Sequence, residues 1–92
     1  MRTVVSIAYY TREQYELLLK LADDRKELHD TWEGWVGEYI KARTNLEALG
    51  AETNKFDVDV QRMADYFKKH KKKNTGETRS AYVSEMASII GL

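Results

Sequence analysis

The chain has 92 residues, of which 42% are hydrophobic and 33% are charged, and its 15 Lys and Arg residues balance its 15 Asp and Glu residues. This length and composition can build one small hydrophobic core, so we expect residues 1–92 to form a single soluble domain rather than a disordered chain. The lack of cysteine excludes disulfides, thiolate metal sites and cysteine nucleophiles, and the neutral net charge gives no general attraction to nucleic acid or membranes.

The first predicted elements are a strand and a helix. Thr3 to Tyr9 carries no charge and is β-branched or aromatic at most positions, which is typical of a strand covered on both faces. Thr11 and Gln14 then form a capping pair, and apolar residues recur beyond them at helical spacing. We therefore expect a helix over residues 12–22.

A second and longer helix is expected to follow. Asp23 and Asp24 are placed to cap it, and Gly50 is a natural residue to end it. Neither glycine nor proline lies between the two helical segments, so residues 12–49 could also form one continuous helix; the sequence favours two. The apolar side chains of the second helix keep the 3.6-residue period: Leu28, Trp32, Trp35, Val36, Tyr39, Ile40, Leu46 and Leu49.

The stretch Lys55 to Val60 alternates strictly between polar and apolar residues, which predicts a second strand with one exposed face. Asp59 is also placed to cap a third helix, whose apolar stripe includes Met63 and Phe67. This helix is expected to run into a series of lysines.

The last predicted helix begins at a capping pair, Asn74 and Glu77, and ends before Gly91. Its expected buried side chains are Tyr82, Val83, Met86, Ile89 and Ile90. The order of elements is β-α-α-β-α-α. The sequence thus predicts a helix-dominated α+β fold with a small two-stranded sheet.

The small sheet suggests that the protein forms a homodimer. Two strands are marginally stable in water, and the first strand lacks a polar face. Because most soluble oligomers have two-fold symmetry, a second copy could join the two sheets or pack against the tryptophan-containing helix.

Positive charge is concentrated near the C-terminus. Residues 1–60 carry 8 Lys and Arg against 12 Asp and Glu, whereas residues 61–92 carry 7 against 3. Such a basic run can neutralise backbone phosphates, although it can also be a solvated helix end whose cations suit the negative pole of the helix dipole. The candidate contacts for nucleic acid or another anion, in the basic segment 68–79, are Lys68, Lys69, Lys71, Lys72, Lys73 and Arg79.

Aromatic residues and glycines alternate closely at the start of the second helix. Trp32, Trp35 and Tyr39 lie on one helical stripe, and Gly34 and Gly37 fall between them. The aromatic side chains either pack into the core or form a surface for a protein partner or ligand. We therefore keep all three as candidate partner-surface residues.

Catalytic and metal-binding patterns are not evident in the sequence. His29 and Asp30 form a dipeptide that metal phosphohydrolases use, but the other histidine, His70, lies among lysines whose charges repel a cation. No serine is accompanied by a histidine at a suggestive spacing or by a glycine elbow. We predict no catalytic residue, no metal, no cofactor and no enzymatic activity.

Two resemblances to known groups can be drawn. The start of the chain, VVSIAYYTREQYELLLKLADD, resembles ribbon-helix-helix repressors, which implies strands from two chains that pair and enter the DNA major groove. The segments DVDVQRMADYF and NTGETRSAYVSE resemble a group of small uncharacterised bacterial proteins. That second resemblance implies no activity.

The sequence therefore predicts a noncatalytic accessory or regulatory protein that acts through protein-protein contacts. The alternative is a nucleic-acid-binding protein that uses the basic segment 68–79. No stretch approaches the roughly 18 apolar residues of a membrane span, so we expect a cytoplasmic protein without membrane contact.

Overall fold

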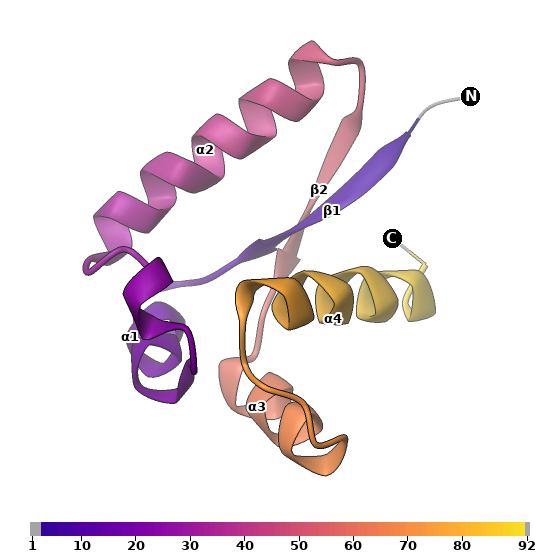
Figure 1. Cartoon of the computed structure of the whole chain (residues 1–92). Coiled ribbons are helices and arrows are strands. Elements are labelled where there is room, and N and C mark those ends of the chain that lie inside the picture. The colour runs from indigo at the N-terminus through magenta and orange to yellow at the C-terminus, as the bar shows by residue number, and fades with distance from the viewer. Residues whose placement is uncertain (1–2, 92) are drawn as a thin grey trace.

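The computed structural model describes residues 3–91, in which four α-helices surround a two-stranded sheet (Figure 1). The elements are β1 (Val4–Tyr9), α1 (Arg12–Leu21), a short 3₁₀ helix η1 (Arg25–Glu27), α2 (Trp32–Ala48), β2 (Glu52–Asp57), α3 (Val60–Lys69) and α4 (Gly76–Ile89). The predicted α+β fold and its order β-α-α-β-α-α are confirmed.

The two strands are parallel, with Val4 opposite Glu52 and Tyr9 opposite Asp57. Parallel strands need a long crossover between them, and α1 and α2 supply it. Side chains alternate between the faces of a strand, so the two faces meet different helices. Figure 1 shows α2 and α4 on opposite sides of the strands, and α4 packs on β1.

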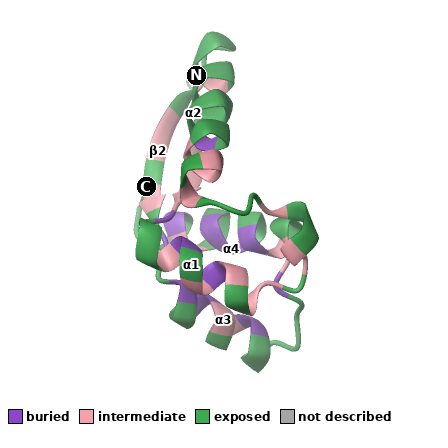
Figure 2. Ribbon diagram, turned by 90° about the vertical axis from the view of Figure 1, so that its left-hand side faces the viewer, coloured by how far each residue is buried: buried purple, intermediate pink, exposed green. Residues whose placement is uncertain are grey.

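The main core lies at one end of the sheet. α1, α3 and α4 meet there, and each contributes fully or almost fully buried side chains, among them Tyr15, Leu18, Met63, Phe67 and Val83. Figure 2 shows this concentration of buried residues, while the far turns of α2 are exposed. The amphipathic stripes predicted for α1 and α3 therefore face one another across this core.

The predicted start of the second helix is wrong. Asp23 and Asp24 lie in a turn before η1, and α2 begins at Trp32, where the Thr31 hydroxyl accepts a hydrogen bond from the Gly34 amide at 3.1 Å. The two aspartates instead accept hydrogen bonds from residues more than 50 positions along the chain. These tertiary contacts outweigh the local capping preference. Two separate helices, rather than one continuous helix, are confirmed.

The second strand lies earlier in the chain than its alternation predicts. β2 ends at Asp57, and the alternating pattern continues past it because Val58 and Val60 are buried in the core that α3 enters. Asp59 is the helix cap as predicted, and its Oδ1 accepts from the Arg62 amide at 3.0 Å. The alternation at Val58 and Val60 therefore reflects the burial of side chains at the start of α3 and not strand pairing.

The ends of α4 also differ from the prediction. Its capping box is formed by Thr75 and Thr78 instead of Asn74 and Glu77. Ile89 and Ile90, expected to be buried, are 69% and 64% exposed, because the last turn of α4 extends beyond the core. The protein thus has uncovered apolar side chains at this end.

A buried ion pair between Asp24 and Arg79 joins the end of α1 to the start of α4. The guanidinium donates from Nη1 to Oδ1 at 2.9 Å and from Nη2 to Oδ2 at 2.8 Å, and Nη1 also donates to Asn74 Oδ1 at 2.9 Å. The Gly76 amide donates to the same carboxylate at 2.9 Å. Burial alone raises the pKa of Asp24, but these hydrogen bonds outweigh it and hold the pKa below its usual value.

Removing this carboxylate should be strongly destabilising, because it leaves the Arg79 charge buried without an opposite charge beside it. We expect Asp24→Ala to lower the free energy of unfolding at pH 7 by about 3 kcal/mol in urea denaturation. The matched control is Asp30→Ala, whose carboxylate is 87% exposed and pairs with Arg25 at the surface, and which should cost less than about 1 kcal/mol.

The same ion pair predicts how the free energy of unfolding changes with pH. The folded-state pKa of Asp24 is depressed, so its contribution is fully present above the unfolded pKa of about 4 and is lost as the pH falls through the folded pKa. The difference between the wild type and Asp24→Ala should therefore shrink below about pH 4. An equal difference at pH 7 and pH 3 would contradict this assignment.

Candidate functional site: a groove along the open edge of β1

A groove of about 490 Å³ runs along β1 between α2 and α4. We call it the edge groove and define it by its lining residues: Val5, Ser6, Ile7, Ala8, Tyr10, Trp35, Glu38, Tyr39, Ala42, Leu46, Ser80, Val83 and Ser84. Consecutive residues of β1 take part, although their side chains point to opposite faces. The groove therefore follows the edge of the strand rather than one face of the sheet.

The backbone hydrogen bonds show which groups of β1 face this groove. The carbonyl oxygens of Thr3 and Tyr9 accept from the β2-side amides of Glu52 and Val58 at 2.8 and 3.1 Å. In a parallel ladder, alternate residues direct both backbone groups to the same neighbour. The odd-numbered residues of β1 therefore bond to β2.

The even-numbered residues Val4, Ser6 and Ala8 turn their amides and carbonyls the other way, toward the open edge of β1. Ser6 and Ala8 line the edge groove, and Val4 borders a neighbouring hollow. Within residues 3–91 the sheet contains only β1 and β2, and no side chain bonds to these groups. Such a row of unpaired groups is a template for another strand. The open edge of β1 is thus both polar along its backbone and enclosed by apolar walls.

The walls of the edge groove are almost uncharged. Glu38 is the one charged residue among those that line it in the described chain. Burial raises the pKa of Tyr10 to about 12, so this phenol stays neutral over the physiological range. Leu46 and Val83 extend the apolar lining on the two helices. The groove suits an uncharged, apolar segment better than a polar ligand.

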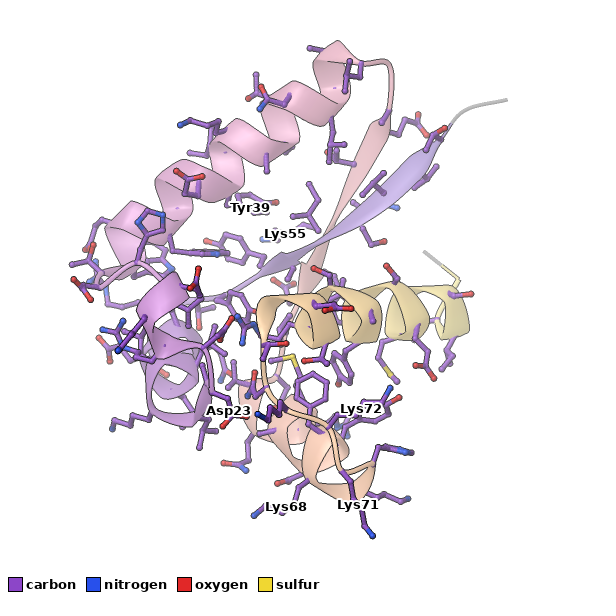
Figure 3. The ribbon with its side chains drawn as sticks, viewed as in Figure 1. Asp23, Tyr39, Lys55, Lys68, Lys71 and Lys72 are labelled. Carbon is purple, nitrogen blue, oxygen red and sulfur yellow. The ribbon has the colours of Figure 1, made fainter. Side chains whose placement is uncertain are left out.

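Of the three aromatic candidates for a partner surface, Trp35 and Tyr39 line this groove, and Trp32 packs against the core outside it. Trp32 Nε1 donates to the Tyr10 carbonyl at 2.8 Å, and the Trp35 ring lies 5.2 Å from that of Tyr10 and 5.7 Å from that of Tyr15. Tyr39 is 8% exposed and points from α2 toward the strands (Figure 3). These contacts leave Trp32 and Trp35 half-buried against the core and Tyr39 buried.

The cover of β1 is less complete than predicted. Its residues from Val5 to Tyr9 are half-buried, and Val4 is 48% exposed. Val4 also borders a second hollow, with Ala87 and Gly91 at the end of α4. The prediction of a strand covered on both faces is therefore wrong at its N-terminal end, where the helices diverge from the sheet.

The basic residues lie far from the edge groove. Lys68, Lys69, Lys71, Lys72 and Lys73 are all exposed, and Figure 3 shows Lys68 and Lys71 around the end of α3. None of these five lysines forms an ion pair within residues 3–91.

Arg79 does not belong with these lysines on the surface, because it is buried and paired with Asp24. Contact with an anion by this arginine would require that pair to break. The nucleic-acid hypothesis consequently depends on the five lysines.

The described residues contain no group of three or more His, Cys, Asp or Glu side chains that could hold a metal. His29 approaches Glu38 with 3.8 Å between Nε2 and Oε1, and Asp30 pairs with Arg25 instead. No helix within residues 3–91 is long and apolar enough to cross a membrane.

Comparison with known protein families, with curated proteins and with solved structures finds no match for this chain in any of the three. The two resemblances drawn from the sequence therefore stay predictions.

Sequence reasoning missed the edge groove as a site. The uncharged first strand carries a signal for it, but the same pattern predicts a strand buried on both faces. A buried strand and a strand with an open edge differ in whether the strand has a neighbour on both sides or on one. Local sequence does not determine the order of strands in a sheet, so it could not show that β1 is paired on one side only.

Proline substitutions should separate the two edges of β1. Proline lacks an amide hydrogen, so Ser6→Pro removes a donor that faces the groove, whereas Ile7→Pro removes one that faces β2. Lys55→Pro is the matched control, because its amide faces the outer edge of β2.

We expect Ile7→Pro to lower the free energy of unfolding by about 2 kcal/mol in urea denaturation. At submicromolar protein, where self-association does not contribute to the measured stability, Ser6→Pro and Lys55→Pro should each lower it by less than about 1 kcal/mol, with unchanged helical circular dichroism. Equal losses for Ser6→Pro and Ile7→Pro would contradict the backbone orientation.

Proposed function

We propose that this protein is a noncatalytic accessory or regulatory protein that acts by binding an extended, uncharged segment of polypeptide in the edge groove. The observation that carries the proposal is the row of unpaired backbone groups at Val4, Ser6 and Ala8, of which Ser6 and Ala8 lie between the walls from α2 and α4. The proposal includes a homodimeric assembly. It also includes a cytoplasmic location, which the lack of cysteine favours.

The chemistry of the groove fits strand addition. In that mode the main-chain hydrogen bonds provide affinity, and pockets for alternate side chains provide specificity. The edge of β1 offers amides and carbonyls in the alternating order that another strand requires. The neighbouring Tyr39 and Leu46 on α2, and Val83 on α4, would cover apolar side chains of the added strand.

Binding of a synthetic peptide tests this function. We expect a peptide of about eight alternating valine and threonine residues to change the tryptophan fluorescence of the protein, because Trp35 lines the groove. The same peptide with N-methylated backbone nitrogens should not bind, since it lacks the donors that strand addition needs. The titration uses submicromolar protein with peptide in excess.

The matched variants are Ser6→Pro, which should lose binding at least tenfold, and Lys55→Pro, which should keep it. Equal binding of the methylated and unmethylated peptides, or no binding by either in a protein that also shows no self-association, would overturn the proposed function.

Nucleic-acid binding is the second candidate, and the exposure of the five lysines near the end of α3 favours it. Lysines that contact phosphates release counterions, so affinity should be greatest at low salt. Fluorescence anisotropy with mixed DNA and RNA at about 50 mM salt measures it directly.

If the lysines bind nucleic acid, joint replacement of Lys68, Lys69 and Lys71 by glutamine should reduce the affinity and the salt slope. The same three replacements should leave the peptide response unchanged. No detectable nucleic-acid binding at this salt concentration would eliminate the second candidate.

A further inference from the structure

We propose that the segment bound in the edge groove is β1 of a second copy of this chain, paired antiparallel about a two-fold axis that passes beside Ser6. The inference rests on the proposed function and names its partner. It makes the two sheets one continuous four-stranded sheet, in the order β2-β1-β1-β2.

The free backbone groups of β1 are arranged symmetrically about Ser6. Val4 and Ala8 lie at equal distances along the strand on either side, and all three residues turn their free backbone groups toward the open edge of β1. An antiparallel partner therefore places Ser6 opposite the partner's Ser6, and Val4 opposite the partner's Ala8. In an antiparallel ladder each such pair exchanges two hydrogen bonds, so every open amide and carbonyl at these three positions is satisfied.

The side chains of the two strands also favour this pairing. β1 carries no charge over Val4–Tyr9, whereas β2 carries Glu52, Lys55 and Asp57. The nearly uncharged groove accepts β1 without burying an unpaired charge, which β2 would do. Among the strands of the described chain, β1 is the suitable occupant.

In this assembly the charged side chains of β2 lie at the two outer edges of the four-stranded sheet. Joining the sheets through β1 leaves one copy of β2 at each outer edge, with Lys55 exposed and 3.8 Å from Asp57. Charged side chains, lysine above all, are the means by which natural edge strands resist further pairing. The assembly is therefore expected to stop at two copies, with closed two-fold symmetry.

The assembly also explains apolar exposure at the N-terminal end of β1. Val4 would lie beside Ala8 of the partner subunit, so its 48% exposure would fall in the dimer.

Sedimentation equilibrium tests self-association directly. At about 100 μM we expect the wild type and Lys55→Pro to have the mass of two chains, and Ser6→Pro to have the mass of one chain. Ser6→Pro should keep the helical circular dichroism of the wild type, so that loss of the dimer is separated from loss of the fold. A wild-type mass of one chain, or a dimer that Ser6→Pro leaves intact, would overturn the inference.

Single cysteines test the register, because the chain has none of its own. Residues in a hydrogen-bonded antiparallel pair have Cα atoms about 5.5 Å apart, which a disulfide can bridge. Under mild oxidation Ser6→Cys should form a linked dimer at least tenfold faster than Val4→Cys. The Val4→Cys and Ala8→Cys double variant should also link rapidly, because these two positions are opposed.

The outcomes of these experiments distinguish self-pairing of β1 from the proposed binding of a peptide in the edge groove. A monomer that binds the valine-threonine peptide, and loses it on Ser6→Pro, would overturn self-pairing and support the proposed function. A dimer whose Val4→Cys variant links as fast as Ser6→Cys would overturn the register. A protein with neither self-association nor peptide binding would overturn both proposals.

Discussion

Parallel pairing between β1 and β2 sets the positions available to the other described elements. A parallel neighbour requires the chain to return to the starting end of the sheet, and the crossover through α1 and α2 places α2 over one face. The pairing also occupies only one side of β1. The open side is the property from which the candidate site follows, because strand geometry turns the backbone groups of Val4, Ser6 and Ala8 toward it.

The ion pair of Asp24 with Arg79 complements this constraint. It holds the start of α4 against the end of α1, so that α4 lies on the face of β1 opposite α2. Without α4 the edge of β1 would face solvent freely, and the edge groove would have one wall. A buried charge pair is a costly way to join two elements, since both ions lose their hydration. Here the carboxylate is further bonded to the Gly76 amide, and the guanidinium to Asn74, which offsets that cost.

Local sequence predicted the elements well where one physical signal acted alone. The Thr11 and Asp59 caps and the stripes of α1 and α3 follow from hydrogen bonding and amphipathicity within one turn or one helix. Predictions failed where tertiary contacts used the same residues. Asp23 and Asp24 resemble helix caps, but their carboxylates bond to the α4 region, and the alternation at Val58 and Val60 reflects the core around α3.

The candidate site was predictable only in part, for the same reason. The aromatic stripe of α2 and the exposed lysines could be read from periodicity and charge, but the burial of Arg79 depends on a partner 55 positions away.

The central claim is that both edges of β1 are paired at concentrations at which the dimer forms. Amide hydrogen exchange resolved by residue measures this directly, because the odd-numbered amides of Val5 and Ile7 report pairing with β2, and the even-numbered amides of Ser6 and Ala8 report the open edge. The account predicts slow exchange at all four amides in concentrated protein, with fast exchange appearing at Ser6 and Ala8 alone on dilution. Fast exchange of Ser6 and Ala8 at every concentration, beside protected Val5 and Ile7, would contradict it.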